Sequence, residues 1–474
     1  MIEISRALAY RFRAVLRRSL MNDNARAPLP IVHCRANDAG LTLEARHGEV
    51  AVRYQVDGAF PADTIAFRGV LLNEMEGRTD TPVVLEVIEP AKGQARWTER
   101  GVPRVVEFEP VAADAAPEFP ALPDKLWPQS PPFLRALADA AATAAKESDR
   151  YATARIQLRG RTGEIVATDG RQMLLQGGFT LPWSDDVLIP ARSIFGARDL
   201  LDEGPIEMGR TRTDLTLRVG ACTLVLRLDL DGRFPNAEAV VPKLGAVKSR
   251  LRFDSADAAY LADALPNLPG FEDEHAPVTL QLGERVTVQA WPAAGGPAVE
   301  VLLARSSLKG TPTRVSTDRQ YLRRALRLGF TELQVTKADA AVCCRDRSRC
   351  YLWVQLGPAT TMPADADVQR TTAADVTADP DTPTPPRRTL PMPTSSANGD
   401  AANGANHRDK NPPAEAPPPG GLAEVILEAE ALRDALHGAL TRTTRLLSAL
   451  KLQKRQTRAV QQAVASLNQL RLDR

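Results

Sequence analysis

The sequence has few aromatic residues and almost no net charge. Aromatic side chains make up 5% of its 474 residues, and 60 basic residues nearly balance 58 acidic ones, which leaves a formal charge of +2. This balance excludes a uniformly basic nucleic-acid-binding chain, so any such contact must come from local clusters. Hydrophobic residues still account for 43% of the chain, and a length of this order predicts about three domains.

The sequence also lacks a disulfide pattern and a membrane segment. Its five cysteines are odd in number and irregularly spaced, which favours a reducing cytoplasm over a disulfide framework. The N-terminal MIEISRALAYRFR is rich in arginine and has no apolar core of a signal peptide. No run of 18 apolar residues occurs, so we expect a cytoplasmic protein without a membrane partner.

The short motifs of common enzymes are missing as well. The sequence contains no P-loop, no H-E-x-x-H and no G-x-S-x-G. Cys343, Cys344 and Cys350 have no second cysteine pair or nearby histidine to complete a zinc site. Asp169 precedes Gly170 and fits a tight turn better than catalysis. We therefore predict no catalytic residue, no metal and no cofactor, and thus no enzyme.

What is present is one order of elements that occurs three times. Each unit has a helix, alternating strands, a second short helix and more strands, which predicts an α+β fold. The predicted helices are 5–20 and 66–77, then 131–148 and 191–203, then 255–266 and 317–328. The units correspond to predicted domains at 1–120, 121–248 and 249–358.

Two local patterns are especially clear within these units. Apolar residues alternate over 215–228 around a Gly220-Ala221 turn, which predicts a β-hairpin. The helix at 317–328 has Ser316, Thr317 or Asp318 available as its N-cap, and Gly329 directly after it.

The composition changes after the third unit. Residues 359–420 are rich in proline, alanine and threonine and contain no aromatic side chain, which predicts a disordered linker. Residues 421–474 then show apolar positions at heptad spacing, which predicts a long helix, a coiled coil or a helical hairpin. This tail could pack on its own copy, on the body of the protein, or on a dedicated partner.

Positive charge is concentrated on particular helices. The first helix has an apolar stripe of Leu8, Phe12, Val15 and Leu16, and arginines on its other face. Such a face suits phosphate contact without base reading, although a solvated surface is the simpler alternative. The third unit repeats the pattern with Arg319, Arg323, Arg324 and Arg327. In contrast, the helix near Asp254–Asp263 is acidic, and it could pair with a basic region of another subunit.

Four segments, in the same order, resemble the beta subunit of bacterial DNA polymerase III, the beta sliding clamp. ATDGRQM (167–173) is similar to the family's ATDGHRL, and DGRFPNAEAVVP (231–242) to its DGRFPDYRRVLP. LPIVHCRANDAGLTLEA, from Leu29, resembles a segment of the family's first domain, and YLWVQL (351–356) its terminal YVVMPM. The resemblance covers residues 1–358.

The resemblance implies three similar clamp domains, with helices inside a ring and antiparallel sheets outside. It implies a head-to-tail homodimer around duplex DNA, served by a DNA polymerase and a clamp loader. Arg26 resembles a family arginine that touches DNA, and Arg150, Tyr151 and Arg192 fall at or beside other such contacts. Together with the basic helices, the predicted DNA-binding set is Arg6, Arg11, Arg13, Arg17, Arg26, Arg150, Tyr151, Arg192, Arg323 and Arg327.

The family also binds partner peptides in an apolar pocket between its second and third domains. The residues carried over to this pocket are Thr153, Thr168, Gly170, Arg171, Gln172, Met173, Pro235, Ala239, Val240, Leu352, Val354, Gln355 and Leu356. Several depart from the family pattern: Arg171-Gln172 replaces His-Arg, Thr153 replaces an apolar residue, and the chain continues beyond Leu356.

The sequence therefore predicts a nucleoid-associated processivity clamp that tethers DNA polymerase. The alternative is a divergent clamp paralogue that acts as a DNA-repair or interaction scaffold through its C-terminal helix, whose partner is unknown.

Overall fold

The structure is a computed structural model. The residues that it describes are 1–22, 27–112, 115, 117–148, 150–197, 204–236, 239–273, 275–292, 297–337, 340–357 and 368–372. The chain divides into two compact units, Met1–Thr384 and Pro385–Arg474, and every described residue belongs to the first. The helix or coiled coil predicted for 421–474 lies outside the described residues, as does most of the predicted linker.

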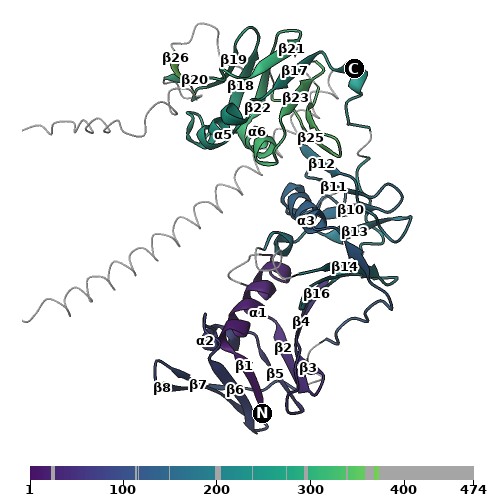
Figure 1. The fold of residues 1–474 in the computed structure, drawn as a ribbon, viewed down its shortest axis with the longest axis vertical. Helices are drawn as coiled ribbons and strands as arrows, with labels where there is room; N and C mark the ends of the chain where they lie inside the picture. The colour runs from purple at the N-terminus through teal and green to yellow at the C-terminus, as the bar shows by residue number, and fades with distance from the viewer. Residues whose placement is uncertain are drawn as a thin grey trace, which may run out of the picture. The chain divides into compact units, whose positions relative to one another are not determined.

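A strand, a helix and three antiparallel strands follow one another repeatedly along the chain (Figure 1). The first group is β1 (Ile2–Ser5), α1 (Arg6–Ser19), β2 (Ile31–Asn37), β3 (Gly40–His47) and β4 (Val50–Val56). The second group is β5 (Asp63–Arg68), α2 (Leu71–Met75), β6 (Pro82–Glu89), β7 (Lys92–Glu99) and β8 (Val102–Phe108).

The third and fourth groups keep this order. The third is β9 (Trp127–Gln129), α3 (Pro132–Thr143), β10 (Arg155–Arg159), β11 (Glu164–Thr168) and β12 (Gln172–Gln176). The fourth is β13 (Asp186–Pro190), the 3-10 turn η1 (Ser193–Gly196), β14 (Ile206–Arg210), β15 (Asp214–Val219) and β16 (Cys222–Arg227).

The last two groups add two short strands to the pattern. The fifth group is β17 (Ser249–Arg252), α5 (Ser255–Ala264), β18 (Pro277–Leu282), β19 (Val286–Ala290) and β20 (Ala298–Leu302), followed by β21 (Ser307–Gly310). The sixth is β22 (Thr313–Asp318), α6 (Arg319–Arg327), β23 (Glu332–Val335), β24 (Val342–Arg345) and β25 (Arg349–Trp353), followed by β26 (Val368–Thr372).

These strands form four sheets. Their strand orders are β1-β6-β7-β8, β5-β2-β3-β4-β16-β15-β14-β9, β13-β10-β11-β12-β25-β24-β23-β17-β21 and β22-β18-β19-β20-β26. The described pairings are antiparallel, except for the parallel pair of β20 and β26. Two sheets cross the predicted domain boundaries, because β4 pairs with β16 and β12 pairs with β25. The chain is thus an α+β protein with antiparallel sheets and few helices.

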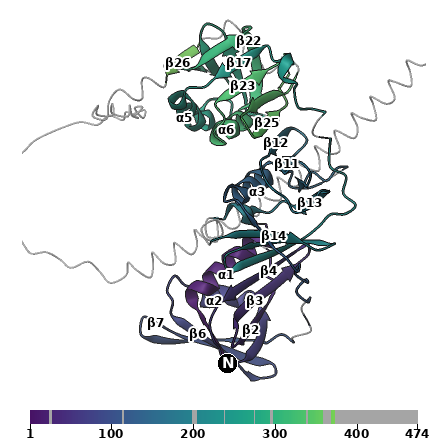
Figure 2. The same cartoon turned by 45° about the vertical axis from the view of Figure 1, so that its right-hand side comes forward.

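The helices lie against the sheets through their apolar faces, and α5 lies beside α6 (Figure 2). The apolar stripe predicted for the first helix, Leu8, Phe12, Val15 and Leu16, is buried. One buried cluster extends from Ile2 to Leu228, and a second draws almost all of its residues from Leu251 to Trp353. The apolar sides of both strands and helices therefore supply continuous cores, as their periodicities predict.

Two local predictions are confirmed. The predicted hairpin is β15 and β16, which pair from Asp214↔Arg227 to Val219↔Cys222 around a turn in which Gly220 has a φ of 52°. The N-cap of α6 is Asp318, whose Oδ1 accepts a hydrogen bond from Gln320 N at 2.8 Å. Gly329 follows this helix with a φ of 82°, a conformation that glycine adopts without the strain of a Cβ atom.

Two predicted helices are too long. Residues 66–68 belong to β5, which pairs with β2 and buries Ile65 and Phe67, so the helix predicted from 66 begins only at Leu71. The helix predicted over 131–148 ends at Thr143, because Ala144 takes an extended conformation. In both places tertiary pairing or packing overrides a helical pattern in the sequence.

The disorder predicted for residues 359–420 does not hold at Val368–Thr372. These five residues form β26, and β-branched Thr371 and Thr372 suit a strand. The composition of the much longer polar segment 359–420 dominates the prediction, so a strand of five residues within it is not detected.

Candidate functional site

Helix α1 carries four of the arginines predicted to contact DNA. Its N-cap Ser5 accepts a hydrogen bond from Leu8 N at 3.1 Å, which fixes where the helix begins. Because the apolar stripe faces the core, the arginines are distributed over the rest of the helix surface. Their partners differ, and these partners decide which guanidinium groups can reach a phosphate.

Arg6 is held within the protein. It donates from Nη2 to the Glu76 carbonyl oxygen at 2.8 Å, from Nε to the Met75 carbonyl oxygen at 3.3 Å, and from Nη1 to Glu99 Oε1 at 2.8 Å. Its guanidinium also lies 5.6 Å from the ring centre of Trp97. With its side chain only 14% exposed, Arg6 joins the start of α1 to α2 and β7.

The remaining arginines of α1 are more accessible. Arg13 forms an ion pair with Glu76, and Arg17 donates to the carbonyl oxygen of Ala27. Arg11 is exposed. Arg11 therefore has the best access to a phosphate among the arginines predicted on this helix.

Helix α6, like α1, has both an enclosed arginine and an exposed one. Arg319 is 1% exposed, and it donates to five carbonyl oxygens at 2.6–3.3 Å, those of Leu265, Leu268, Pro269, Ala276 and Pro277. Burial lowers the pKa of its guanidinium, but the carbonyl dipoles stabilise the charge. Arg319 thus fixes the segment between α5 and β18 and is not available to a ligand.

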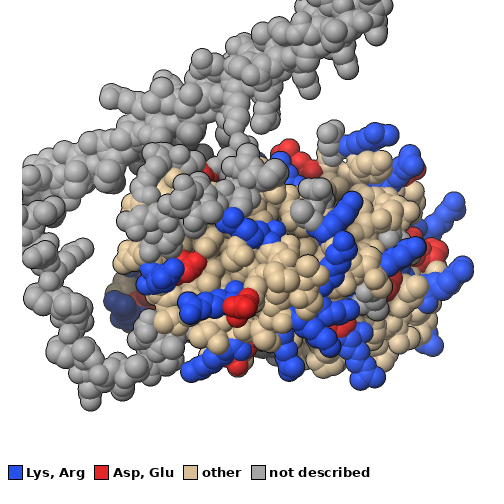
Figure 3. Space-filling view, turned by 90° about the horizontal axis from the view of Figure 1, so that it is seen from above, with Lys and Arg blue, Asp and Glu red and all other residues tan. Residues whose placement is uncertain are grey.

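The other arginines of α6 line a surface cavity of about 500 Å³. Arg323 donates to the Ala262 carbonyl oxygen at 2.9 Å. Arg324 donates to the Asp139 carbonyl oxygen at 2.7 Å and to Thr143 Oγ1 at 2.8 Å, which links α6 to α3. Arg327 is exposed. Figure 3 shows basic side chains spread more widely than acidic ones over the face that it draws.

The predicted contacts of the middle segment lie in varied surroundings. Arg150 is exposed, and its guanidinium lies 5.5 Å from the ring centre of Tyr151. Arg192 lies 3.6 Å from Glu49 Oε2, and burial lowers its pKa. Arg26 lies outside the described residues.

A charged network that sequence reasoning missed joins the first and third groups of elements. Arg155 donates to both oxygens of Glu49, at 2.7 and 2.5 Å, and to Asp229 Oδ2 at 3.0 Å. The hydrogen bond from Arg155 lowers the pKa of Glu49. The partners are 106 and 74 residues away in the chain, so no local spacing could have indicated this network.

The acidic helix α5 uses two of its carboxylates inside the protein. Asp254 caps the helix by accepting a hydrogen bond from Ala256 N at 2.9 Å. Asp257 is fully buried, and its Oδ2 accepts hydrogen bonds from Arg305 N, Ser306 N and Ser306 Oγ. These two residues therefore stabilise the fold and add little to a negative surface patch.

The predicted peptide pocket begins at the turn between β11 and β12. Asp169 Oδ1 accepts hydrogen bonds from the backbone N–H groups of Arg171 and Gln172, each at 2.8 Å. Thr168 Oγ1 donates to the Gln172 carbonyl oxygen at 2.6 Å and accepts from Gly170 N at 3.0 Å. Asp169 therefore shapes this turn, as its position before Gly170 in the sequence predicts.

Strand pairing brings the distant parts of the predicted pocket together. Met173 lies opposite Leu352 in the β12–β25 pair. The side chain of Gln172 is buried, and its Oε1 accepts a hydrogen bond from the Tyr351 hydroxyl at 2.6 Å. Gln172, which departs from the family pattern, therefore has a hydrogen-bond partner in Tyr351 on the neighbouring strand β25.

Apolar residues predicted for the pocket pack with other side chains of this chain. Met173 and Leu352 are each 5% exposed, and they pack in one cluster with Phe234 and Val241 from the 231–242 segment. Sequence reasoning named the segment but missed these two residues and the cluster's Val166, Cys343 and Cys350. Alternation along β24 and β25 could have indicated the cysteines.

The remaining pocket residues surround this cluster. Val240 is 50% exposed and Val354 45% exposed, so these two predicted pocket residues leave apolar surface accessible. Gln355 donates from Nε2 to the carbonyl oxygens of Lys337 and Ala340, at 3.0 and 2.6 Å. Gly170, Arg171 and Ala239 are exposed, whereas Thr153, Pro235 and Leu356 are half-buried.

Cys343 and Cys350 lie side by side within the same cluster. Their Sγ atoms are 3.4 Å apart, and both cysteines are free. The hydrogen bond from Cys343 lowers the pKa of Cys350 to about 7 and raises that of Cys343. The two thiol groups therefore form a hydrogen-bonded pair within the cluster that contains Met173 and Leu352.

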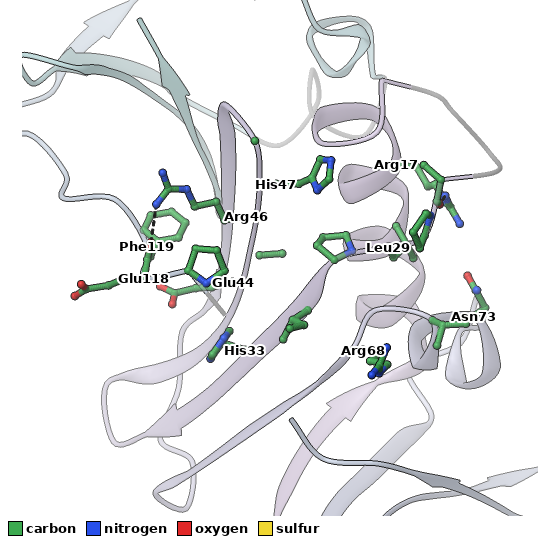
Figure 4. Close-up of a pocket in the computed structure, with 18 of the residues that line it drawn as sticks. Arg17, Leu29, His33, Glu44, Arg46, His47, Arg68, Asn73, Glu118 and Phe119 are labelled. Carbon is green, nitrogen blue, oxygen red and sulfur yellow. Dashed lines mark hydrogen bonds between the residues drawn. The ribbon is translucent and has the colours of Figure 1, made fainter. Parts of the chain in front are cut away.

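A separate cavity of about 1020 Å³ lies between β2, β3 and the C-terminal part of α1. Figure 4 shows Arg17, Leu29 and Asn73 on its helical side and His33, Glu44 and Arg46 on its sheet side. His33 is buried, and neither of its ring nitrogens has a hydrogen-bond partner among the described residues. The sequence contained no motif that indicated this cavity.

No family profile and no curated protein sequence matches the chain. Comparison with solved structures nevertheless defines its class: the chain has the fold of a bacterial DNA polymerase sliding clamp. The resemblance inferred from the motifs is thereby confirmed for the fold. None of the helices in the described part of the chain is long and apolar enough to cross a membrane.

Three solved clamps illustrate the similarity. The sliding clamp of Pseudomonas aeruginosa, solved with a ligand, has a TM-score of 0.62 and 18% identity, covering 75% of this chain and 99% of that chain. The Bacillus subtilis clamp has a TM-score of 0.64 and 15% identity, covering 75% and 98%. The beta chain of Streptococcus pneumoniae has a TM-score of 0.62 and 16% identity, covering 75% and 99%.

Proposed function

We propose that this chain is the subunit of a DNA sliding clamp. Two copies, joined head to tail, would encircle duplex DNA and tether a DNA polymerase in the bacterial cytoplasm, at the nucleoid. The subunit would comprise domains at 1–120, 121–248 and 249–358, with helices toward the DNA and no catalytic residue. The observation that carries this proposal is a clamp fold that extends over 99% of a known clamp's length.

The strand junctions support closure by a second copy. Each of the two internal junctions joins the last strand of one group to the last strand of another, β4 to β16 and β12 to β25. β20 and β8 are the strands that end the three-strand runs of the fifth and second groups. By analogy with the internal junctions, β20 would pair with β8 of a second copy. An interface between two different surfaces generates a ring when its rotation closes.

The surface of β8 fits this role. Its internal counterparts β16 and β25 are almost entirely buried, because they have neighbours on both edges. In β8, however, Val102 is 53% exposed and Val105 is 55% exposed. Apolar side chains on an unpaired edge strand favour strand addition by a partner.

Electrostatic contact with DNA would be made without base reading. Arg11 and Arg327 are exposed on helices α1 and α6, and Arg150 is exposed in the loop between α3 and β10. A guanidinium fits any phosphate, so such contacts allow movement along the duplex. A closed ring would also need a clamp loader to open it around DNA without ends.

Retention on DNA tests the proposal. A ring loaded on closed circular DNA should remain through a wash at high salt, because the link is topological, and it should slide off after the circle is cut. Ordinary phosphate contacts weaken steeply with salt on either form. Equal loss from circular and linear DNA would exclude the ring.

The packing of Phe234 and Val241 at the predicted pocket favours a second function. Because Met173 and Leu352 pack against the chain's own Phe234 and Val241, a standard clamp-binding peptide would have to displace these side chains. The protein would then be a clamp paralogue that acts as a DNA-repair or interaction scaffold through its C-terminal helix. Titration of a standard clamp-binding peptide discriminates: saturable binding favours the processivity clamp, and no binding at millimolar concentration favours the scaffold.

A further inference from the structure

The edge of β20 is already occupied by the chain's own β26. The two strands pair in parallel from Ala298↔Val368 to Leu302↔Thr372, and β26 is the outermost strand of its sheet (Figures 1 and 2). The segment lies after residue 358, where the motif resemblance to the clamp family ends, and the known clamps cover 75% of this chain. We therefore infer that β26 is an addition to the clamp fold.

Side-chain contacts reinforce the pairing. Arg370 donates from Nε to Glu300 Oε1 at 3.1 Å. The hydroxyl groups of Thr371 and Tyr260 lie 3.2 Å apart, which connects β26 to helix α5. Glu300 is itself positioned from the other side, because its Oε2 accepts a hydrogen bond from Gln289 Nε2 at 2.7 Å. The strand therefore has specific partners on both β20 and α5.

The occupied edge is the one that the internal junctions assign to another strand. In the repeated order of elements, β20 corresponds to β4 and β12, and each of these pairs along its outer edge with an antiparallel strand. A strand edge has one row of free N–H and C=O groups, so it can pair with only one neighbour. β26 and a second copy's β8 therefore cannot pair with β20 at the same time.

We propose that β26 is an intramolecular strap that competes with β8 of a second copy for the edge of β20, so that the ring closes only when β26 is released. This inference rests on the proposed ring. Because both copies must expose their β20 edge, the apparent dissociation constant of the dimer equals the intrinsic constant divided by the square of the fraction of chains whose β20 edge is free.

The two competing strands differ in what they offer. β26 has five residues, and its Arg370 side chain is 77% exposed. β8 has seven residues and presents Val102 and Val105 for burial. Antiparallel pairing is also slightly more stable per residue than parallel pairing. Release of β26 is thus compensated by the formation of a longer and more apolar junction.

The test uses the full chain with the double substitution Arg370→Pro and Thr371→Pro. Alternate N–H groups along a strand point to opposite edges, so one of two adjacent prolines removes a donor to β20. The same change removes the Arg370 and Thr371 side-chain contacts. The matched control is Thr377→Pro with Ala378→Pro, two adjacent prolines in the same segment but outside β26.

Sedimentation equilibrium should give a dimer dissociation constant at least about tenfold lower for the β26 variant than for the control and the unmodified chain. Hydrogen exchange of the unmodified chain provides a second measurement. From monomer to dimer, amides of Val368–Thr372 should lose protection while amides of Val102–Phe108 gain it.

Two results would overturn the strap and leave the ring intact: equal dissociation constants in the two variants, or a dimer in which Val368–Thr372 remains protected. If no variant associates at any concentration, the proposed ring fails, and the strap fails with it. The outcomes thus separate an error in this inference from an error in the proposed function.

Discussion

At the scale of single residues, arginines on one helix have different tasks because their neighbours differ. Arg319 and Arg327 are two turns apart on α6, yet the first is enclosed by backbone carbonyls and the second is exposed. Sequence periodicity places both on a basic helix. It could not separate them, because the burial of Arg319 depends on the Leu265–Pro277 segment that wraps around it.

Replacing Arg319 by methionine should destabilise the protein. The substitution leaves the carbonyl oxygens of Leu268, Pro269 and Pro277 without their donor in a buried place. We expect the free energy of unfolding to fall by about 3 kcal/mol, measured by urea denaturation. Arg327→Met on the exposed face is the matched control and should change it by less than about 0.5 kcal/mol. Equal effects of the two substitutions would contradict the structural role of Arg319.

Glu49 should make stability depend on pH. The hydrogen bond from Arg155 lowers its pKa below the ordinary value of 4.5, so the ionised carboxylate adds stability above that value and loses it as the pH falls through the lowered pKa. Because the Glu49 side chain is 40% exposed, Glu49→Gln should cost less than about 1 kcal/mol at pH 7.

The cost of Glu49→Gln should then vanish progressively in unfolding measurements made below pH 4.5. If the free energies of unfolding of the unmodified chain and the Glu49→Gln variant differ by the same amount at pH 7 and well below pH 4.5, ionisation of Glu49 does not contribute to stability.

At the scale of elements, regular periodicity in the sequence predicted helices and strands correctly. The start of α2 and the short strand β26 depend on tertiary pairing and were not predicted. The β15–β16 hairpin follows from alternation and its Gly220-Ala221 turn, and α6 follows from its Asp318 cap. The start of α2 was wrong, because the pairing of β5 with β2 depends on residues about thirty positions away in the chain. β26 was missed because the edge that it covers exists only in the folded protein.

Of the candidate site, sequence motifs predicted which segments meet but not how they pack. The β11–β12 turn and β25 do lie together. The packing of Phe234 and Val241 at the predicted pocket depends on the path of the 231–242 segment, which no local pattern determines.

The exposed arginines of the helices should govern the salt dependence of DNA binding. Arg11→Ala combined with Arg327→Ala removes two exposed charges, and within the described part of the chain neither side chain makes a hydrogen bond that stabilises the fold. For a short linear duplex, the slope of log affinity against log salt should shrink by about 2 per chain. Fluorescence anisotropy at several salt concentrations measures it. Arg161→Ala, an exposed arginine in the β10–β11 turn, should leave the slope unchanged, and an equal change there would contradict the assignment.

At the scale of the whole molecule, the unpaired strand edge of β8 should decide whether copies associate. Val105→Asp places a charge on an apolar side chain that is 55% exposed in the single chain, so monomer stability should change little. The dimer dissociation constant should rise at least about tenfold, or roughly 1.4 kcal/mol. Val87→Asp, on the inner strand β6 of the same sheet and 41% exposed, is the control and should leave association unchanged in sedimentation experiments.

The pairing of β20 with β26 also sets how the protein responds to its own abundance. Only ten residues separate Gly357 from Val368, and a strand on so short a tether has an effective concentration in about the millimolar range at its binding edge. That local concentration does not change when the cell makes more or less protein, whereas the concentration of a second copy does. Assembly would therefore begin only above an expression threshold, and chains below that threshold would stay single, with one of their two reactive edges covered.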